Sequence, residues 1–121
     1  MGKSVHNDVL DAALDEVATA TNMHANSQEP TTKAEADTTY QLATKTTPTF
    51  TGPADGDTSG RKITVDAASS VSVDNSGAAN HVSLTDAAVL LYVTTVTTPP
   101  TLNSGGTVNF GAWDIEILDP A

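Results

Sequence analysis

Beyond residue 38 the chain is a series of short runs rich in Val, Ile and Thr, and Gly, Pro, Asn or Asp separates each run from the next. Strands that recur at roughly 8–12-residue intervals with such turns between them are typical of β-sandwiches and barrels. Apolar residues alternate within the runs, as Ile63 and Val65 do. We therefore expect a mainly β fold, a β-sandwich or small barrel of about 7–9 short strands.

The N-terminal part has a different period. Residues 5–22 place apolar side chains at helical spacing, with acidic residues on the opposite side, which predicts an amphipathic helix. Residues 23–37 are polar and contain Pro30, which indicates a loop or extended linker. We expect two parts, an N-terminal helix and linker arm over residues 1–37 and a β-sandwich body over residues 38–121.

The charge of the chain limits its partners. Fifteen acidic residues against five basic ones give a net charge of −10. Nucleic-acid phosphates and anionic membranes attract Lys and Arg, so we expect neither as a partner. The longest apolar run, residues 87–93, is too short to span a bilayer.

The expected core is small. Aromatic residues make up 4% of the chain, and it has no cysteine for a disulfide or a thiolate–metal site. Small domains without such links are commonly stabilised by association with other chains. We therefore expect a homo-oligomer, either a trimer or a dimer, or a protein that is stabilised by docking on something larger.

Two patterns could indicate a metal site. Residues 55–60 resemble the start of a calcium-binding loop, but Arg61 and Lys62 follow where further oxygen ligands are needed, so we interpret the segment as a turn. The chain has three histidines, His6, His24 and His81. Their spacing matches no metal-binding pair, and we expect them to be unrelated and exposed or half-exposed.

The sequence contains no motif for an enzyme nucleophile or for phosphate binding. Four acidic helix residues are interpreted as a solvated face: Asp8, Asp11, Asp15 and Glu16. A Ser–His–Asp triad assembled from distant residues stays open. We predict no catalytic residue, no cofactor and no metal. Trp113 and Phe110 are expected in the core, and the alternative is that the aromatic residues form a sugar-stacking patch.

The candidate binding residues are apolar. The longest β run, residues 89–97, is apolar on both faces, which indicates a central strand or a strand with one side against a partner. The helix stripe also needs a surface, belonging either to its own chain or to a neighbour. The predicted partner-binding residues are Val9, Leu10, Ala13, Leu14, Val17, Leu90 and Tyr92.

Several segments resemble small virion proteins of tailed bacteriophages. These segments are residues 1–14 (MGKSVHNDVLDAAL), 27–32 (SQEPTT), 57–62 (DTSGRK) and 113–117 (WDIEI). The resemblance implies a non-enzymatic structural protein, a head decoration (cement) protein that binds the major capsid protein on the outer surface of the head. It also implies location in the virion after synthesis in the bacterial cytoplasm. The alternatives are another head–tail or tail component, or a surface-displayed glycan-binding module.

Overall fold

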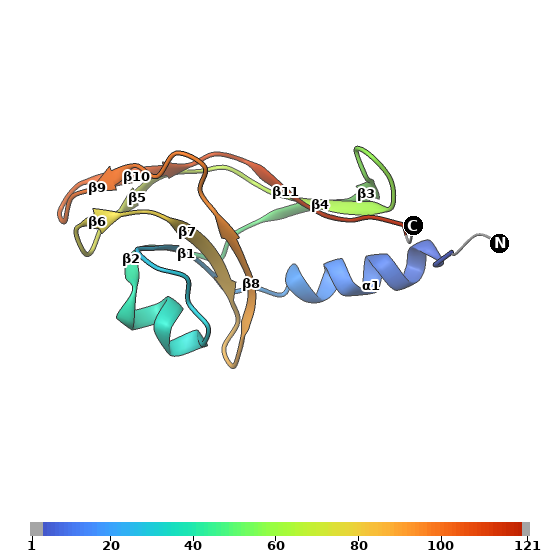
Figure 1. Ribbon diagram of the computed structural model, residues 1–121, viewed down its shortest axis with the longest axis horizontal. Coiled ribbons are helices and arrows are strands. Elements are labelled where there is room, and N and C mark those ends of the chain that lie inside the picture. The colour runs from blue at the N-terminus through green and yellow to red at the C-terminus, as the bar shows by residue number, and fades with distance from the viewer. Residues whose placement is uncertain (1–3, 120–121) are drawn as a thin grey trace. The chain divides into compact units, whose positions relative to one another are not determined.

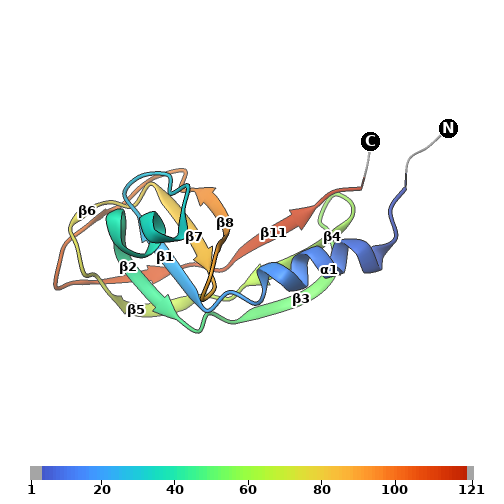
Figure 2. The ribbon, with the colours of Figure 1, turned by 90° about the horizontal axis from the view of Figure 1, so that it is seen from below.

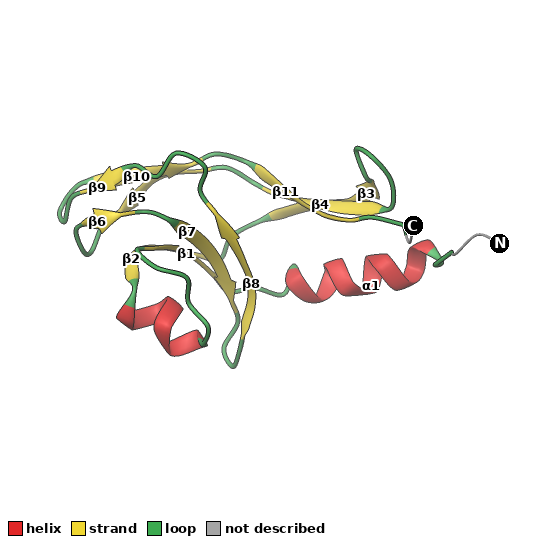
Figure 3. Ribbon diagram, in the orientation of Figure 1, coloured by secondary structure: helices red, strands yellow, loops and turns green. Residues whose placement is uncertain are grey.

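The computed structural model describes residues 4–119. It is mainly β, with short antiparallel strands, one α-helix near the N-terminus and a short π-helix (Figures 1 and 3). The sheets are sandwich-like and do not close into a barrel, so the predicted fold class is confirmed in its sandwich form. The described residues contain eleven strands. Three of them, β1 (Asn22–Asn26), β6 (Gly77–Ala78) and β9 (Thr101–Leu102), are not predicted by the sequence pattern. Within this range, no helix is both long enough and apolar enough to cross a membrane.

The described chain forms two compact units, each assembled from separate segments. The first, which we call the helix unit, contains residues 4–19, 49–67 and 111–119. The second, the sheet unit, contains residues 20–48 and 68–110. This division differs from the predicted arm and body, because strands from the middle and the end of the chain pack with the helix.

The helix unit combines α1 (Asn7–Val17) with a three-stranded sheet. The sheet has the order β11 (Trp113–Ile117), β4 (Arg61–Val65), β3 (Phe50–Asp55). Helix α1 contacts β4 and β3 and lies along them (Figures 1 and 2). The buried core of the helix unit is entirely apolar and contains Leu10, Leu14, Ile63, Val65 and Ile115. The alternation of Ile63 and Val65 therefore predicts the buried face of β4 correctly.

Helix α1 is shorter than the predicted segment 5–22. The side chain of His6 caps it by accepting a hydrogen bond from the backbone N–H of Asp8, at 3.1 Å. The structure thus places the cap at His6, whereas Ser4 or Asn7 would be the usual choices by residue type. The helix ends at Val17, and the chain turns before β1 begins.

The sheet unit is built around a four-stranded antiparallel sheet. Its order is β2 (Gln41–Thr46), β1 (Asn22–Asn26), β7 (His81–Thr85), β8 (Leu90–Thr95). Residues 23–26 of the predicted linker 23–37 form most of β1, so the prediction of a loop or extended linker is wrong there. Four consecutive residues of β1, Met23 to Asn26, are all buried. The usual alternation of apolar and polar residues identifies strands with one solvated face, and it cannot identify a strand that is covered on both faces.

The two faces of this sheet are covered differently. On one face, Met23 lies opposite Leu84 and Ala25 opposite Ala43, and this apolar face belongs to the core with Leu42, Val71 and Val73. The remaining strands are β5 (Ala68–Ser72), β10 (Thr107–Phe110), β6 (Gly77–Ala78) and β9 (Thr101–Leu102). The other face carries polar side chains, and the π-helix η1 (Glu35–Thr39) contacts β1 and β2.

Candidate functional site

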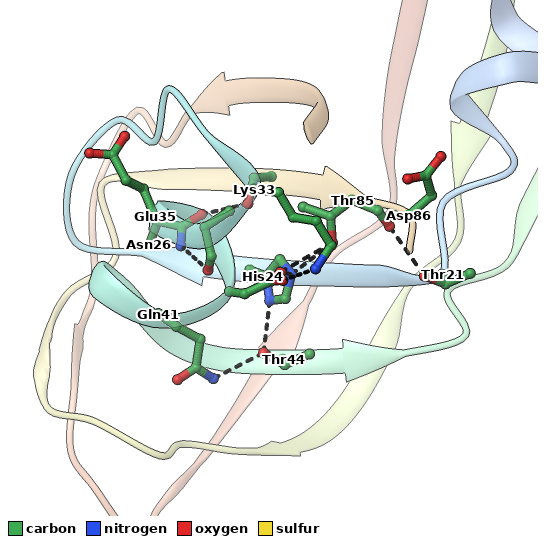
Figure 4. A network of polar contacts seen from close by, with 12 residues as sticks. Thr21, His24, Asn26, Lys33, Glu35, Gln41, Thr44, Thr85 and Asp86 are labelled. Carbon is green, nitrogen blue, oxygen red and sulfur yellow. Dashed lines mark hydrogen bonds and ion pairs between the residues drawn. The ribbon is translucent and has the colours of Figure 1, made fainter. Parts of the chain in front are cut away.

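The polar face of the sheet unit is centred on His24 of β1. Its imidazole is buried, with the residue only 2% exposed. The ring Nδ1 lies 2.8 Å from the Thr44 hydroxyl of β2, and Nε2 lies 2.8 Å from a carboxylate oxygen of Asp37 in η1. The Thr85 hydroxyl of β7 is 3.0 Å from the same Nε2 (Figure 4). The prediction that all three histidines are at least half-exposed is therefore wrong for His24.

These contacts form a chain of hydrogen bonds in which every donor points toward Asp37. The amide nitrogen of Gln41 donates to the Thr44 hydroxyl at 2.9 Å. In the neutral tautomer of His24, Nδ1 accepts from Thr44 and Nε2–H donates to Asp37, which also accepts from the Lys33 ammonium. We call these five residues, Lys33, Asp37, His24, Thr44 and Gln41, the polar relay.

Burial decides the charge of the imidazole. Desolvation lowers the pKa of His24 below its ordinary value of 6.5, and it outweighs the nearby Asp37 carboxylate, which acts to raise it. The Lys33 ammonium acts in the same direction as burial. His24 is therefore neutral at pH 7, which is consistent with the hydrogen-bond directions described above.

Asn26, two residues further along β1, completes the polar face. Its side-chain nitrogen donates to the carbonyl of Ala36 at 3.0 Å, and its side-chain oxygen accepts from the Ser83 hydroxyl at 2.6 Å. Asn26 and Ser83 are both fully buried. Because buried polar groups cost free energy unless they are hydrogen-bonded, these contacts fix η1 on the sheet.

A hydroxyl, an imidazole and a carboxylate in this order also occur in hydrolase triads. The surroundings in the polar relay favour a structural role. The imidazole is covered, the Thr44 hydroxyl already accepts from Gln41, and Lys33 ties the carboxylate of Asp37. The imidazole of a triad must pass a proton to the leaving group of the substrate, and His24 is instead enclosed by contacts with β2, β7 and η1 (Figure 4).

The other histidines take no part in this cluster. His6 is exposed and caps α1, whereas His81 is half-buried at the start of β7. Among residues 4–119, no three His, Asp or Glu side chains gather in a way that could hold a metal ion.

Residues 55–60 form a turn, as predicted. The Gly56 N–H donates to the Gly60 carbonyl at 3.0 Å. Gly60 has a φ of +67°, and a Cβ there would come within 1.9 Å of the Ile117 carbonyl oxygen, so only glycine fits. The two basic residues after the turn, Arg61 and Lys62, bind carboxylates of the helix unit and not a metal site.

Arg61 and Lys62 each bind two carboxylates. Arg61 lies 2.8 Å from Asp11 of α1 and 2.7 Å from Asp55, which ties the helix to β4. Lys62 lies 2.6 Å from Asp57 and 3.4 Å from Asp114. Their own pKa values are raised, chiefly by the hydrogen bonds to Asp11 and Asp57. The acidic helix face is thus solvated at Asp8, Asp15 and Glu16, and Asp11 is the exception.

The structure separates the predicted helix contacts into two groups. Leu10 and Leu14 are buried in the core of the helix unit, so α1 packs on its own chain. Val9 is 60% exposed, Ala13 is exposed and Val17 is half-buried. Only the second group is available to another molecule without unfolding the unit.

Strand β8 contains the other two predicted contacts. Leu90 and Tyr92 are both half-buried, and so are Leu91 and Val93 on the alternate face. Strand β8 stands at the end of the order β2–β1–β7–β8, so the interpretation as a central strand is wrong. The interpretation as a strand with one side open to a partner stays a prediction. Val89, just before β8, is 49% exposed.

The aromatic residues follow the expected pattern in part. Phe110 at the end of β10 is buried, as predicted for a core residue. Trp113 at the start of β11 is half-buried and lies opposite Val65 of β4. The structure therefore leaves part of the Trp113 side chain accessible.

Comparison of the chain with models of protein families, with curated proteins and with solved structures finds no match. The functional argument therefore depends on the residues themselves.

Proposed function

We propose that the protein is a non-enzymatic structural component of a tailed-phage virion, a decoration protein that binds the outer capsid surface and stabilises the head. The proposal combines the sequence resemblance with the way the charged groups are used. Arg61, Lys62 and the polar relay all hold segments of the chain together. An acidic surface is repelled by packaged DNA and suits the outside of a shell.

The observation that carries the proposal is the position of the uncovered apolar side chains. Val9 projects from an otherwise acidic helix, and Val89 adjoins an edge strand whose faces are both half-covered. Most of the surface carries net negative charge, so an exposed apolar side chain and an unpaired strand edge are candidates for contact with other proteins. We assign the capsid contact to the outer face of α1, with Val9, Ala13 and Val17. We assign the contact with neighbouring virion proteins to β8, with Leu90 and Tyr92.

The direct test is co-sedimentation of the purified protein with particles that lack it. Deletion of α1 is a poor test, because it removes Leu10 and Leu14 from the core of the helix unit. Val9→Asp changes only an exposed side chain, and Thr38→Asp adds the same charge to an exposed residue of η1. We expect Val9→Asp to weaken particle binding at least tenfold and Thr38→Asp to leave it unchanged. Equal binding by both variants would remove the helix from the interface.

Two alternatives predict different outcomes in the same kind of experiment. A tail or head–tail component would sediment with isolated tails and not with heads. A glycan-binding module would use the accessible part of Trp113, and host surface glycans would then change Trp113 fluorescence. If heads bind the protein and glycans leave the fluorescence unchanged, the decoration proposal is supported over both.

A further inference from the structure

The two edges of the sheet in the sheet unit are protected differently. Along β2, the backbone N–H groups of Asp74 and Asn75 donate to the Leu42 carbonyl at 2.7 and 3.1 Å, and Ala43 forms a bridge with Val73. Strand β2 also carries Lys45. Strand β8 is six residues long, pairs with β7 on one side and contains no Pro, Gly or charged residue. It thus lacks the usual features that prevent an edge strand from pairing with another chain.

The charge distribution favours the same edge. The chain has a net charge of −10, so two copies repel each other wherever their acidic surfaces meet. Residues 87–113 contain no Asp, Glu, Lys, Arg or His. This segment includes β8, so two copies can approach through β8 with little electrostatic repulsion.

We propose that β8 pairs with β8 of a second copy of this chain, in antiparallel orientation about a two-fold axis, to form one continuous sheet across the dimer. This inference rests on the proposed function, because it names the neighbour that β8 contacts in the assembly. A two-fold pair uses the same surface on both copies, so it closes and does not extend into a fibre. The open hydrogen-bonding edge and the half-covered side chains are then buried together.

The antiparallel orientation follows from the position of Asp86, the charged residue nearest to β8. A parallel in-register pair would place Asp86 of one copy beside Asp86 of the other, which is unfavourable. In an antiparallel pair centred between Tyr92 and Val93, Asp86 lies opposite Pro99, in the uncharged segment after β8. The antiparallel arrangement thus keeps the two carboxylates apart.

The first experiment measures the mass of the full-length protein by sedimentation equilibrium over a range of concentrations. We expect the wild type to be a dimer, and Leu91→Lys to weaken self-association at least tenfold, because it places two like charges near the two-fold axis. The matched control is Thr46→Lys, which adds the same charge to an exposed residue of the opposite edge strand, β2. It should leave the dimer unchanged. Circular dichroism establishes whether each variant is folded.

A second measurement does not depend on disrupting the fold. The chain has no cysteine, so one spin label can be attached at a single introduced cysteine. Thr95→Cys on β8 should give a distance of about 17 Å between the two labels, from five residues at ~3.4 Å each. Thr46→Cys on β2 should give more than about 34 Å, since seven strand spacings of ~4.8 Å separate the two sites across the sheet and they are also offset along the strands.

A wild type that stays monomeric at high concentration would overturn the β8 dimer, and so would a short distance at Thr46 with a long one at Thr95. Particle binding is a separate readout. A monomer that still binds heads would leave the decoration proposal intact and remove only the self-pairing. A β8 dimer that fails to bind heads would leave the self-pairing intact and remove the decoration proposal.

Discussion

Helix α1 in the helix unit and η1 in the sheet unit are attached to their sheets by different interactions. In the helix unit, α1 lies on an apolar core of Leu10, Leu14 and Ile63, and an ion pair between Arg61 and Asp11 joins helix and sheet at the periphery. In the sheet unit, η1 is held by buried hydrogen bonds to His24 and Asn26. Apolar contacts and hydrogen bonds respond differently to substitution, pH and salt, so the two units should be separable by experiment.

The largest effect is expected in the core of the helix unit. Leu14 is fully buried between α1 and the sheet, and Leu14→Ala removes its contacts and leaves a cavity. Such a change costs about 2–5 kcal/mol. Urea unfolding followed by circular dichroism measures it, with Ala13→Gly on the exposed side of α1 as a control for helix propensity. A loss no larger than that of the control would mean that α1 is not part of this core.

The polar relay should give the next largest effect. Asp37→Ala leaves the Nε2–H of His24 without its carboxylate acceptor and releases Lys33. The Thr85 hydroxyl can still accept from this N–H, so the cost is that of losing a hydrogen bond to a charged group, about 1.5–3 kcal/mol. The same unfolding experiment tests this, and hydrogen exchange should show faster exchange in η1 than in α1. Wild-type stability in this variant would show that the polar relay contributes nothing to holding η1.

The next effect in size is a dependence of stability on pH, which we expect to come from His24 of the sheet unit. The folded protein lowers the pKa of His24, so the unfolded chain binds more protons between the folded pKa and 6.5. The stabilisation from neutral His24 is complete above pH 6.5 and is lost as the pH falls toward the folded pKa. Thermal unfolding from pH 7.5 to 5 should show this loss. His24→Gln should flatten the profile, and an unchanged slope in this variant would show that another group causes the loss.

The smallest effect is expected at the ion pairs of the helix unit. Arg61 binds carboxylates near the surface, where solvent and salt weaken the attraction. Asp11→Asn should lower the melting temperature less than any change above, and added salt should reduce the difference from wild type. A salt-independent loss as large as that of Leu14→Ala would show that this pair does more than fasten the helix at its edge.

The sequence predicts what depends on local apolar pattern. The strands around Ile63, Val65, Val71 and Val73 alternate clearly, and all four residues are buried as expected. Strand β1 was missed because His24 and Asn26 stand where an ordinary core strand carries apolar residues. Their burial depends on partners from β2, β7 and η1 that are distant in the sequence, and no periodicity reveals such partners.

The predicted contact residues illustrate the same limit. A helical stripe identifies the apolar side of α1, but it does not show that β4 covers Leu10 and Leu14 and leaves Val9 outside. Similarly, the apolar run of β8 predicts a strand, whereas its position at an edge depends on the order of pairing. Arg61 directly follows a turn that needs glycine, but only the structure shows that Arg61 reaches Asp11 of α1.

The helix unit is assembled from three segments that span nearly the whole chain, and this has a consequence for synthesis. Helix α1 leaves the ribosome first, but the sheet that covers it is complete only after β11 has emerged, about a hundred residues later. Until then α1 can pack only on β4 and β3, without the third strand of their sheet. The sheet unit can fold earlier, because its last strand, β10, ends at Phe110. In the nascent chain the sheet unit should therefore be complete slightly before the helix unit.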